Sequence, residues 1–258
     1  MTRSWDDYFW PGEKVLRNKL DEHGFLALQA AEYRVTAYRD GQIARGEIPI
    51  ARTFDTAHLN DIHRALFSDV YDWAGEIRAV PMSKNGIAFA TPDRIGIYLN
   101  DVARVVRETP WAQLDRDDTA AAAARIYALG NVAHPYREGN GRALKIFVNH
   151  VAAQAGYEFD FDAIDKDVWN QRSMLSMPDL GAHEPHPDEL APVFAHIITD
   201  LPAPAPAIDP ALLEQARNAA RLAGIDNPRQ PGTGATHPRP HTPKPASRPR
   251  GRDTDYGR

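Results

Sequence analysis

The sequence predicts a mainly α-helical protein with one small β-hairpin and a disordered C-terminal tail rich in proline and arginine. Several stretches repeat their apolar residues with the 3.6-residue period of an amphipathic helix. One segment, residues 77–92, instead has two short apolar runs separated by an Asn-Gly turn. Residues 231–258 contain no aliphatic side chain larger than alanine, so they cannot bury enough apolar area to offset the entropy of ordering.

The first helices are expected over residues 25–39 and from Asp55 onward. Asp55 or Thr56 is a favourable N-cap, because its side-chain oxygen can accept hydrogen bonds from free backbone N–H groups of the first turn. The apolar residues that follow keep the helical spacing, and they are Leu59, Ile62, Leu66 and Val70.

The hairpin is expected from strands over residues 77–80 and 87–90, with the turn at residues 83–86. Asn-Gly between apolar runs is a strong hairpin cue, and no other part of the sequence gives a convincing strand signal. A hairpin in a helical protein leaves an edge with unpaired backbone groups, which invites another chain unless the edge is charged, covered or used.

An alanine-rich helix is expected in the middle of the chain. Asp118 or Thr119 can cap it, and its larger apolar residues are Ile126, Leu129 and Val132. The helix should end as His134 is reached, because the residue before a proline is pushed out of the helical region.

A second central helix is expected over residues 141–155, with Gly156 as its terminator. It is apolar on several faces, as a helix in the centre of a protein would be. Further helices are expected over residues 93–107, 163–174 and 188–200, and one more from Asp209-Pro210.

Composition narrows the class of protein. The chain has 258 residues, a net charge of −5 and no cysteine. The lack of cysteine excludes disulfides, thiolate catalysis and Cys-ligated zinc, so any metal is expected to be a hard cation held by oxygen. The negative charge disfavours general nucleic-acid binding, and no apolar run is long enough for a membrane span. A cytoplasmic protein with about 200 folded residues is expected.

Residues 134–145, with the sequence His-Pro-Tyr-Arg-Glu-Gly-Asn-Gly-Arg-Ala-Leu-Lys, concentrate the groups that phosphate chemistry requires. Gly139 and Gly141 flank an asparagine, so the backbone can turn sharply and present N–H groups without a Cβ in the way. The following helix aims its free N–H groups and the positive end of its dipole at this loop. Arg142 adds a planar fork of donors that matches phosphate oxygens.

Two side chains add reactive chemistry to this loop. A histidine near its unperturbed pKa, such as His134, can accept a hydroxyl proton at neutral pH. Glu138 is the single carboxylate of the loop, and one carboxylate with phosphate oxygens is the usual way in which a protein holds Mg²⁺. Together these residues predict a transferase that uses a nucleotide.

The loop resembles the signature of the Fic family, which reads His-Pro-Phe-x-(Asp/Glu)-Gly-Asn-Gly-Arg-x-x-Arg, at all but two defined positions. Tyr136 stands where the family has phenylalanine, so its hydroxyl needs a partner. Lys145 stands where the family has its last arginine, and an ammonium cannot reproduce the bidentate contact of a guanidinium. The resemblance implies that the residue at this position contacts the γ-phosphate, so the change to Lys145 affects that contact.

The resemblance extends to residues 9–20 and 69–78, which look like segments of bacterial Fic toxins, and it covers roughly residues 5–200. It implies a helical N-terminal extension over residues 1–50 and a Fic catalytic domain over residues 51–201.

Two further regions complete this division of the chain. Residues 202–230 are a spacer with a possible helix, and residues 231–258 are the basic tail, with six basic side chains against two aspartates. A solubilising extension is the simplest role for the tail. Contact with an acidic partner, or a basic C-terminal secretion signal like those of some Fic effectors, are the alternatives.

The resemblance implies transfer of AMP from ATP to a Tyr, Ser or Thr hydroxyl of a target protein, with His134 as the base and Glu138 as the Mg²⁺ ligand. The residues implied to bind the nucleotide phosphates are Arg137, Gly139, Asn140, Gly141, Arg142 and Lys145. The hairpin matches the family's flap, which pairs with the target by β-augmentation. The implied flap residues are Ser83, Lys84, Asn85, Gly86, Ile87, Ala88 and Phe89.

Other functions stay open at this point. A phosphotransferase of the same family would bind the nucleotide reversed, although such members lack the acidic residue that stands here as Glu138. Transfer from UTP or GTP is open because no residue identified here selects the base. A non-catalytic protein-binding module, using the flap edge, is the alternative from another class.

The sequence lacks an inhibitory motif that many members of this family carry, which bears on how the protein is regulated. Many Fic proteins block their own γ-phosphate site with a helix that carries Ser/Thr-x-x-x-Glu-Gly or -Asn. The one glutamate of this chain followed by glycine is Glu138, inside the catalytic loop, and His134 stands four positions before it. The resemblance therefore implies the toxin of a toxin–antitoxin pair, with a separate small antitoxin and with DNA gyrase or topoisomerase IV as the target.

Overall fold

A computed structural model describes residues 3–84, 86–202, 214–215 and 218–219 of the chain. The chain divides into two units, residues 1–203 and 204–258, and nearly all of the description concerns the first. In chain order the helices and strands are α1 (Phe25–Ala44), α2 (Thr56–Phe67), β1 (Ser83–Lys84), β2 (Ile87–Ala88), α3 (Pro92–Glu108), α4 (Arg116–Ala133), α5 (Asn140–Ala152), β3 (Tyr157–Phe159), α6 (Lys166–Leu175), α7 (Ala191–Ile197) and β4 (Ile198–Asp200). The predicted class, mainly helical with a small hairpin, is confirmed.

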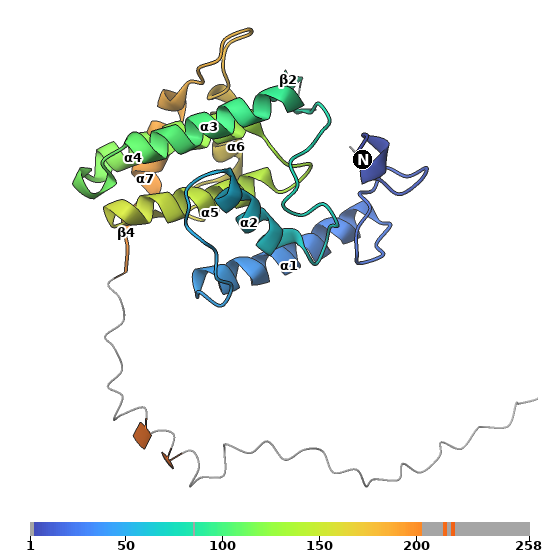
Figure 1. Ribbon diagram of the computed structural model, residues 1–258, viewed down its shortest axis with the longest axis horizontal. Helices are drawn as coiled ribbons and strands as arrows, with labels where there is room; N and C mark the ends of the chain where they lie inside the picture. The colour runs from blue at the N-terminus through green and yellow to red at the C-terminus, as the bar shows by residue number, and fades with distance from the viewer. Residues whose placement is uncertain (1–2, 85, 203–213, 216–217, 220–258) are drawn as a thin grey trace, which may run out of the picture. The chain divides into compact units, whose positions relative to one another are not determined.

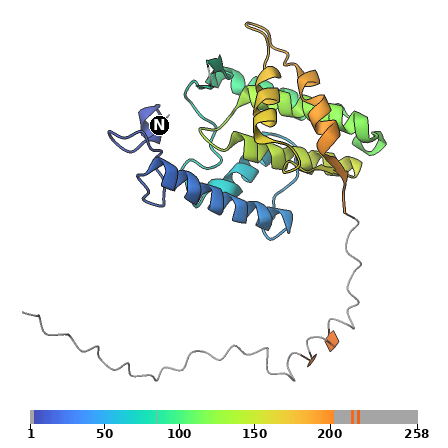
Figure 2. The ribbon, with the colours of Figure 1, turned by 180° about the vertical axis from the view of Figure 1, so that it is seen from behind.

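Helices α4 and α5 form the centre of this unit (Figures 1 and 2). Helix α4 packs against α3, α5 and α7, while α5 also packs against α2, which in turn packs against α1. Small residues permit the close approach of the two central helices. A Cβ on Gly130 of α4 would lie only 2.7 Å from the nearest side-chain atom of Leu144 on α5, so a larger residue there would force the helices apart.

The central helices begin and end close to the predicted positions, with one correction. The N-cap of α4 is Asp115, whose side chain accepts a hydrogen bond from the backbone N–H of Asp118, so the prediction of Asp118 or Thr119 as the cap was wrong. The helix starts there because Asp115 offers the same capping oxygen one turn earlier. Helix α5 continues as a 3-10 turn over Ala153–Ala155 and ends at Gly156 with φ of 83°, as predicted.

The N-terminal helices differ from prediction mainly in length. Helix α1 runs to Ala44 rather than residue 39. Asp55 caps α2 as predicted, but the helix ends at Phe67. Val70 therefore lies outside it, and it is still fully buried because the chain turns back and the Val70 N–H donates to the Phe67 carbonyl.

The predicted strand over residues 77–80 was wrong. The paired strands are only β1 and β2, in antiparallel register with Ser83 opposite Ala88 and Lys84 opposite Ile87. Just outside the strands, the Phe89 N–H donates to the Met82 carbonyl at 3.0 Å, and beyond this bond the flanking segments bond to the end of α4 and the loop after it. The Arg78 N–H donates to the Pro135 carbonyl in that loop, and the Ala90 N–H donates to the Val132 carbonyl in the last turn of α4, which fixes both ends of the hairpin.

The predicted helix over residues 188–200 was also wrong at both ends. A 3-10 turn over Pro187–Glu189 precedes the short α7, and residues 198–200 form β4, which pairs with β3 in an unpredicted antiparallel sheet. The sheet forms because an apolar β-branched residue, Ile198, is buried opposite Phe159.

The remaining helices, α3 and α6, confirm the predictions over residues 93–107 and 163–174 within a few residues. Of the helix expected from Asp209, only residues 214–215 and 218–219 are described, and they are helical. The predicted tail over residues 231–258 lies outside the described residues. No helix in the described ranges is both long enough and apolar enough to span a membrane.

Buried histidines make the fold sensitive to acid. Burial lowers the pKa of His58 on α2, of its hydrogen-bonded partner His150 on α5, and of His63 to about 4 each. Since an unfolded histidine has a pKa near 6.5, the unfolded chain binds more protons between these values, and the free energy of unfolding falls as the pH drops from about 6.5 toward 4.

We expect chemical denaturation to show a free energy of unfolding lower by at least about 2 kcal/mol at pH 5 than at pH 7.5. A double variant, His58→Asn with His150→Asn, removes two of the titrating groups and should show a smaller difference between the two pH values. Equal free energies at both pH values in the wild type would contradict the neutral buried state of these histidines.

Candidate active site

The loop between α4 and α5 has a tightly constrained backbone. His134 ends α4 in the left-handed conformation, with φ of 40°, which few residues other than glycine adopt. Gly139 precedes α5 with φ of 80°, and a Cβ there would lie 2.2 Å from the ring of Phe67. The first glycine of the loop, Gly139, is therefore required for steric reasons, since only glycine combines this φ with this space.

Asn140 closes the loop through its amide. Its Oδ1 accepts from the Tyr136 N–H and its Nδ2 donates to the Tyr136 carbonyl, each at 2.7 Å. Both ends of the side chain therefore hold the turn, and the side chain is largely buried. The phosphate contact that the resemblance implies for Asn140 would use a group that the loop already employs for its own backbone.

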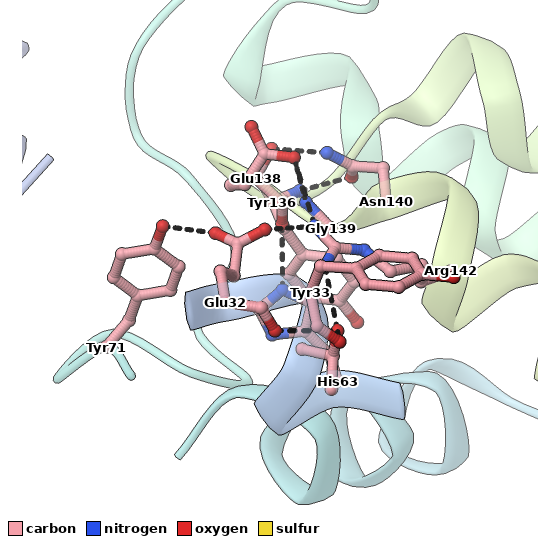
Figure 3. A network of polar contacts seen from close by, with 10 residues as sticks. Glu32, Tyr33, His63, Tyr71, Tyr136, Glu138, Gly139, Asn140 and Arg142 are labelled. Carbon is pink, nitrogen blue, oxygen red and sulfur yellow. Dashed lines mark hydrogen bonds and ion pairs between the residues drawn. The ribbon is translucent and has the colours of Figure 1, made fainter. Parts of the chain in front are cut away.

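Tyr136 and His63 anchor the loop to α2. The Tyr136 hydroxyl donates to Asn60 Oδ1 at 2.8 Å, which supplies the partner that the Phe-to-Tyr departure requires. Its ring stacks on His63 with centroids 3.8 Å apart. His63 Nδ1 accepts from the Gly75 N–H at 2.8 Å, so Nε2 carries the proton and donates to the Glu138 carbonyl at 2.9 Å (Figure 3).

His134 presents a neutral imidazole beside the flap. Its ring stacks on Phe89, with centroids 3.6 Å apart. Burial, together with the positive charges of Arg78 and Lys84, lowers the pKa of His134 to about 3. Its Nδ1 is buried and has no hydrogen-bond partner among the described residues.

Arg78 ties the flap to this histidine. The guanidinium is buried and donates to four carbonyls, at 2.7 Å to His134, 2.6 Å to Val80, 2.6 Å to Ala90 and 3.2 Å to Ala133. These acceptors come from both ends of the flap and from the end of α4. Arg78 therefore fixes the position of the flap relative to the backbone that carries the His134 ring.

A cavity of about 240 Å³ lies between the flap, His134 and α6. Lys84, Ile87 and Phe89 of the predicted flap line it, as do His134 and Gly141 of the loop. On the other side it is lined by residues of α6, among them Trp169 and Asn170. A larger cavity of about 640 Å³ near Trp111 is lined by none of the predicted site residues.

The flap itself is exposed at its tip. Ser83, Lys84, Gly86 and Ala88 are exposed, whereas Ile87 and Phe89 are half-buried against the cavity. Gly86 has φ of 80°, as the two-residue turn requires. Asn85 lies outside the described residues.

Glu138 and Arg142 lie together at the start of α5. Glu138 Oε1 accepts from the Gly139 N–H at 2.9 Å and lies 3.4 Å from Arg142 NH2. Arg142 also donates to Glu32 of α1 at 2.5 Å (Figure 3). A third contact of Arg142 is to the Thr36 hydroxyl, at 3.0 Å. The predicted phosphate-binding arginine is thus already held by a helix that lies far from it in the sequence.

Arg137 and Lys145 both lie against aromatic rings. The Arg137 guanidinium lies 4.5 Å from the ring of Trp5 and 5.2 Å from that of Phe9, in the N-terminal segment. The Lys145 ammonium lies 4.7 Å from the Phe161 ring and 4.6 Å from the Trp169 ring. Burial lowers the pKa of both groups. Lys145 contacts Trp169, which lines the cavity, but Lys145 itself is not one of the lining residues.

Sequence reasoning missed Glu32, His63 and Arg78 as parts of this site. A weak signal existed for Glu32, because Leu28, Glu32 and Thr36 follow each other at helical spacing and share the buried face of α1. His63 also lies beside apolar positions of α2, next to Ile62. No spacing rule points to Arg78, whose partners depend on how the chain folds back.

Comparison with known proteins agrees with this geometry. The model of the Fic/DOC family matches residues 53–152. The probable protein adenylyltransferase Fic of Escherichia coli K12 is 32% identical over 197 residues, which cover 76% of this chain and 93% of that protein. The corresponding protein of Salmonella typhimurium LT2 is 34% identical over 69% of this chain and 88% of its own length.

A solved structure shows the same fold. The N-terminal Fic domain of a VirB-translocated Bep effector protein of Bartonella quintana, determined with bound ADP, has a TM-score of 0.67 and 26% identity. The match covers 76% of this chain and 95% of that one. The loop geometry, the family match and the relatives together establish that the chain belongs to the Fic/DOC family.

Proposed function

We propose that the chain transfers AMP from ATP to a Tyr, Ser or Thr hydroxyl of a target protein. The chain is an enzyme of the nucleotidyltransferase type, as are the relatives named protein adenylyltransferases. The observation that carries the proposal is the neutral His134 ring at a cavity wall that also includes the first turn of α5 and the flap.

His134 takes the proton of the target hydroxyl as the hydroxyl oxygen attacks the α-phosphorus. The bond from the α-phosphorus to the oxygen that bridges it to the β-phosphate breaks, and pyrophosphate leaves. At neutral pH the His134 imidazole is uncharged, so one ring nitrogen can accept a proton without first losing one. A histidine with so low a pKa is a weak base, but the negative charge of a bound triphosphate opposes the charges of Arg78 and Lys84 and raises the pKa of His134 toward a useful range.

The phosphates are held at the N-terminus of α5. The first backbone N–H groups of a helix have no partner within the helix, and here they belong to residues 140–142. Arg142 has five N–H donors, of which its contacts to Glu32, Thr36 and Glu138 use three. The remaining donors are available to stabilise charge on the transferring and leaving phosphates.

Glu138 is the residue that would hold Mg²⁺. The described residues contain no cluster of three or more metal-binding side chains, so a cation would bind through this one carboxylate, phosphate oxygens and water. The half-exposed side chain of Glu138 at the α5 terminus fits that role. When bound, Mg²⁺ neutralises charge on the α- and β-phosphates.

The flap holds the target segment. The exposed β1–β2 hairpin offers unpaired backbone groups to an extended peptide, while Phe89 and Lys84 lie at the cavity beside His134. A segment paired with this edge brings its hydroxyl to the imidazole. Fixed positioning of this kind supplies most of the catalysis in phosphoryl-type transfer.

The proposed reaction is tested with ATP that is labelled at either of two phosphates. Incubation of the chain with host proteins and ATP labelled at the α-phosphate should place label on protein, whereas ATP labelled at the γ-phosphate should not. Label from the γ-position would indicate the family's phosphotransfer instead, and label from neither would favour a non-catalytic binding module. Labelled UTP and GTP test the choice of base, and mass spectrometry locates the modified hydroxyl.

The resemblance to bacterial Fic toxins also suggests a regulatory partner and a target. We propose a separate antitoxin that brings a glutamate to the γ-phosphate site, and DNA gyrase or topoisomerase IV as the modified protein. Expression of the chain alone should slow growth of a bacterial host, with added AMP on one of these enzymes. Growth arrest without any such modification would exclude them as the targets.

Lys145 offers a direct probe of the γ-phosphate contact. Because arginine is a bidentate fork that also stacks well on aromatic rings such as Trp169, Lys145→Arg should lower the KM for ATP severalfold. Lys166→Arg, an exposed change of the same kind on α6, is the matched control and should leave KM unchanged. A KM that rises in Lys145→Arg would mean that the pocket is shaped for an ammonium.

A further inference from the structure

A buried carboxylate outside the family-matched segment reaches into the catalytic loop. Glu32 lies on α1, whereas the Fic/DOC match begins at residue 53. Its Oε1 accepts from Arg142 NH2 at 2.5 Å, and Thr36, one turn later on α1, accepts from Arg142 NH1 at 3.0 Å. Figure 3 shows the Glu32 and Arg142 side chains directed toward one another.

Glu32 is itself fixed on its other side. The Tyr71 hydroxyl donates to Oε2, and Tyr71 is fully buried. The Glu32 side chain is only 10% exposed, so its charge is removed from water and stays favourable only while its partners remain in place. The Thr36 hydroxyl donates to the Glu32 carbonyl at 2.9 Å, which aims its oxygen lone pairs at Arg142.

Arg142 is therefore held from several directions. Its guanidinium lies 4.6 Å from the ring of Phe67, the buried residue that also packs against Gly139. Its NH2 lies between two carboxylates, 2.5 Å from Glu32 and 3.4 Å from Glu138. The two carboxylates compete for one guanidinium, and Glu32 makes the shorter contact.

We propose that Glu32 is a positioning residue for Arg142, which it orients toward the phosphates and keeps from closing on Glu138. The inference rests on the proposed AMP transfer for the assignment of Arg142 to the phosphates. Without Glu32, the nearest remaining carboxylate for Arg142 is Glu138, and a tight pair between them would neutralise the charge that attracts Mg²⁺. Loss of Glu32 thus weakens nucleotide binding and raises the Mg²⁺ concentration that binding requires.

The opposite change in nucleotide affinity would follow if the contact between Glu32 and Arg142 were inhibitory. A glutamate that merely neutralised Arg142 would weaken phosphate binding in the wild type, so its removal would tighten nucleotide binding and raise activity. The direction of change on removal of Glu32 therefore separates support from inhibition.

The test is a double-mutant cycle on nucleotide binding. Affinity for a non-hydrolysable ATP analogue is measured by calorimetry, with and without Mg²⁺, in Glu32→Ala, Arg142→Ala and the double variant. We expect Glu32→Ala to weaken binding with Mg²⁺ about tenfold and to raise the Mg²⁺ concentration needed. In the Arg142→Ala background, the same change should alter affinity by no more than about twofold, because the partner is gone.

Two further variants exclude a general loss of structure. Glu32→Gln keeps an oxygen for Arg142 but not the charge, so it should bind more tightly than Glu32→Ala. Asp69→Asn breaks another contact of α1, in which Arg39 Nε donates to Asp69 at 2.9 Å, and it should bind nucleotide as the wild type does. A purely structural role predicts losses that follow thermal stability and persist in the Arg142→Ala background.

Three results would overturn the inference: unchanged or tighter binding in Glu32→Ala, an equal loss in the Arg142→Ala background, or an unchanged Mg²⁺ requirement. Failure of the proposed function is separate. A wild-type chain that binds nucleotide but transfers no α-label would refute AMP transfer, while the binding cycle would still decide whether Glu32 acts through Arg142.

Discussion

His134→Ala is expected to lower AMP transfer by a factor on the order of 10²–10⁴, while ATP affinity changes no more than severalfold. A general base acts in the transition state, and the phosphate contacts proposed for this protein come from the α5 N-terminus and Arg142. The measurement pairs transfer of α-label to protein with calorimetric binding of an ATP analogue.

The backbone at this position calls for a second substitution. His134 has φ of 40°, so alanine adds backbone strain and also removes the ring that stacks on Phe89. Asparagine tolerates the left-handed conformation better and cannot act as the base, so His134→Asn should be as inactive as His134→Ala. His186→Ala, at an exposed histidine, is the control for general effects. A variant at His134 that keeps more than about a tenth of the activity is incompatible with its role as the base.

The parts of the site that the sequence predicts are those set by short spacing. The turn glycines, the base and the carboxylate of residues 134–142 lie within a few residues of each other, so local rules for loops and helix ends apply to them. The end of α4 at His134 likewise follows from the single residue Pro135. The flap turn at Asn85-Gly86 is another local signal.

The parts that it does not predict depend on contacts between distant segments. Glu32 and Arg142 are 110 positions apart, and Arg78 and His134 are 56 apart. A buried charged residue cannot be told from a surface residue in the sequence, because no neighbouring residue indicates which distant residue will be its partner. The same limit explains β3 and β4, whose pairing over about 40 residues has no local turn signal.

The predicted strand over residues 77–80 failed for a related reason. Alternation of apolar and polar residues over 77–80 is compatible with a strand, but the Arg78 N–H donates to the Pro135 carbonyl in the loop after α4. The Arg78 guanidinium donates to carbonyls at the end of α4 and at both ends of the flap. The Arg78 backbone N–H is therefore hydrogen-bonded to the loop after α4 instead of to a second strand. A period-2 pattern predicts an extended chain, and only the fold determines what that chain pairs with.

Glu138→Gln should raise the Mg²⁺ concentration needed for half-maximal transfer by at least about tenfold and slow turnover at saturating Mg²⁺. An amide brings no charge to a site that otherwise has only phosphates and water. Glutamine keeps the oxygen that accepts from the Gly139 N–H, at 2.9 Å in the wild type, so the turn that starts α5 stays intact. The substitution thus separates the charge of Glu138 from its role in the loop.

Glu138→Ala is the companion variant, because it removes the charge and the Gly139 contact together. If the charge is what matters, both variants share the raised Mg²⁺ requirement, and only Glu138→Ala is also less stable to denaturant. Equilibrium binding of Mn²⁺ as a spectroscopic probe, in the presence of an ATP analogue, gives a readout independent of turnover. Wild-type Mg²⁺ dependence in Glu138→Gln would remove Glu138 from the metal site, and the effect of Glu32 on that site would then need another route than competition for Arg142.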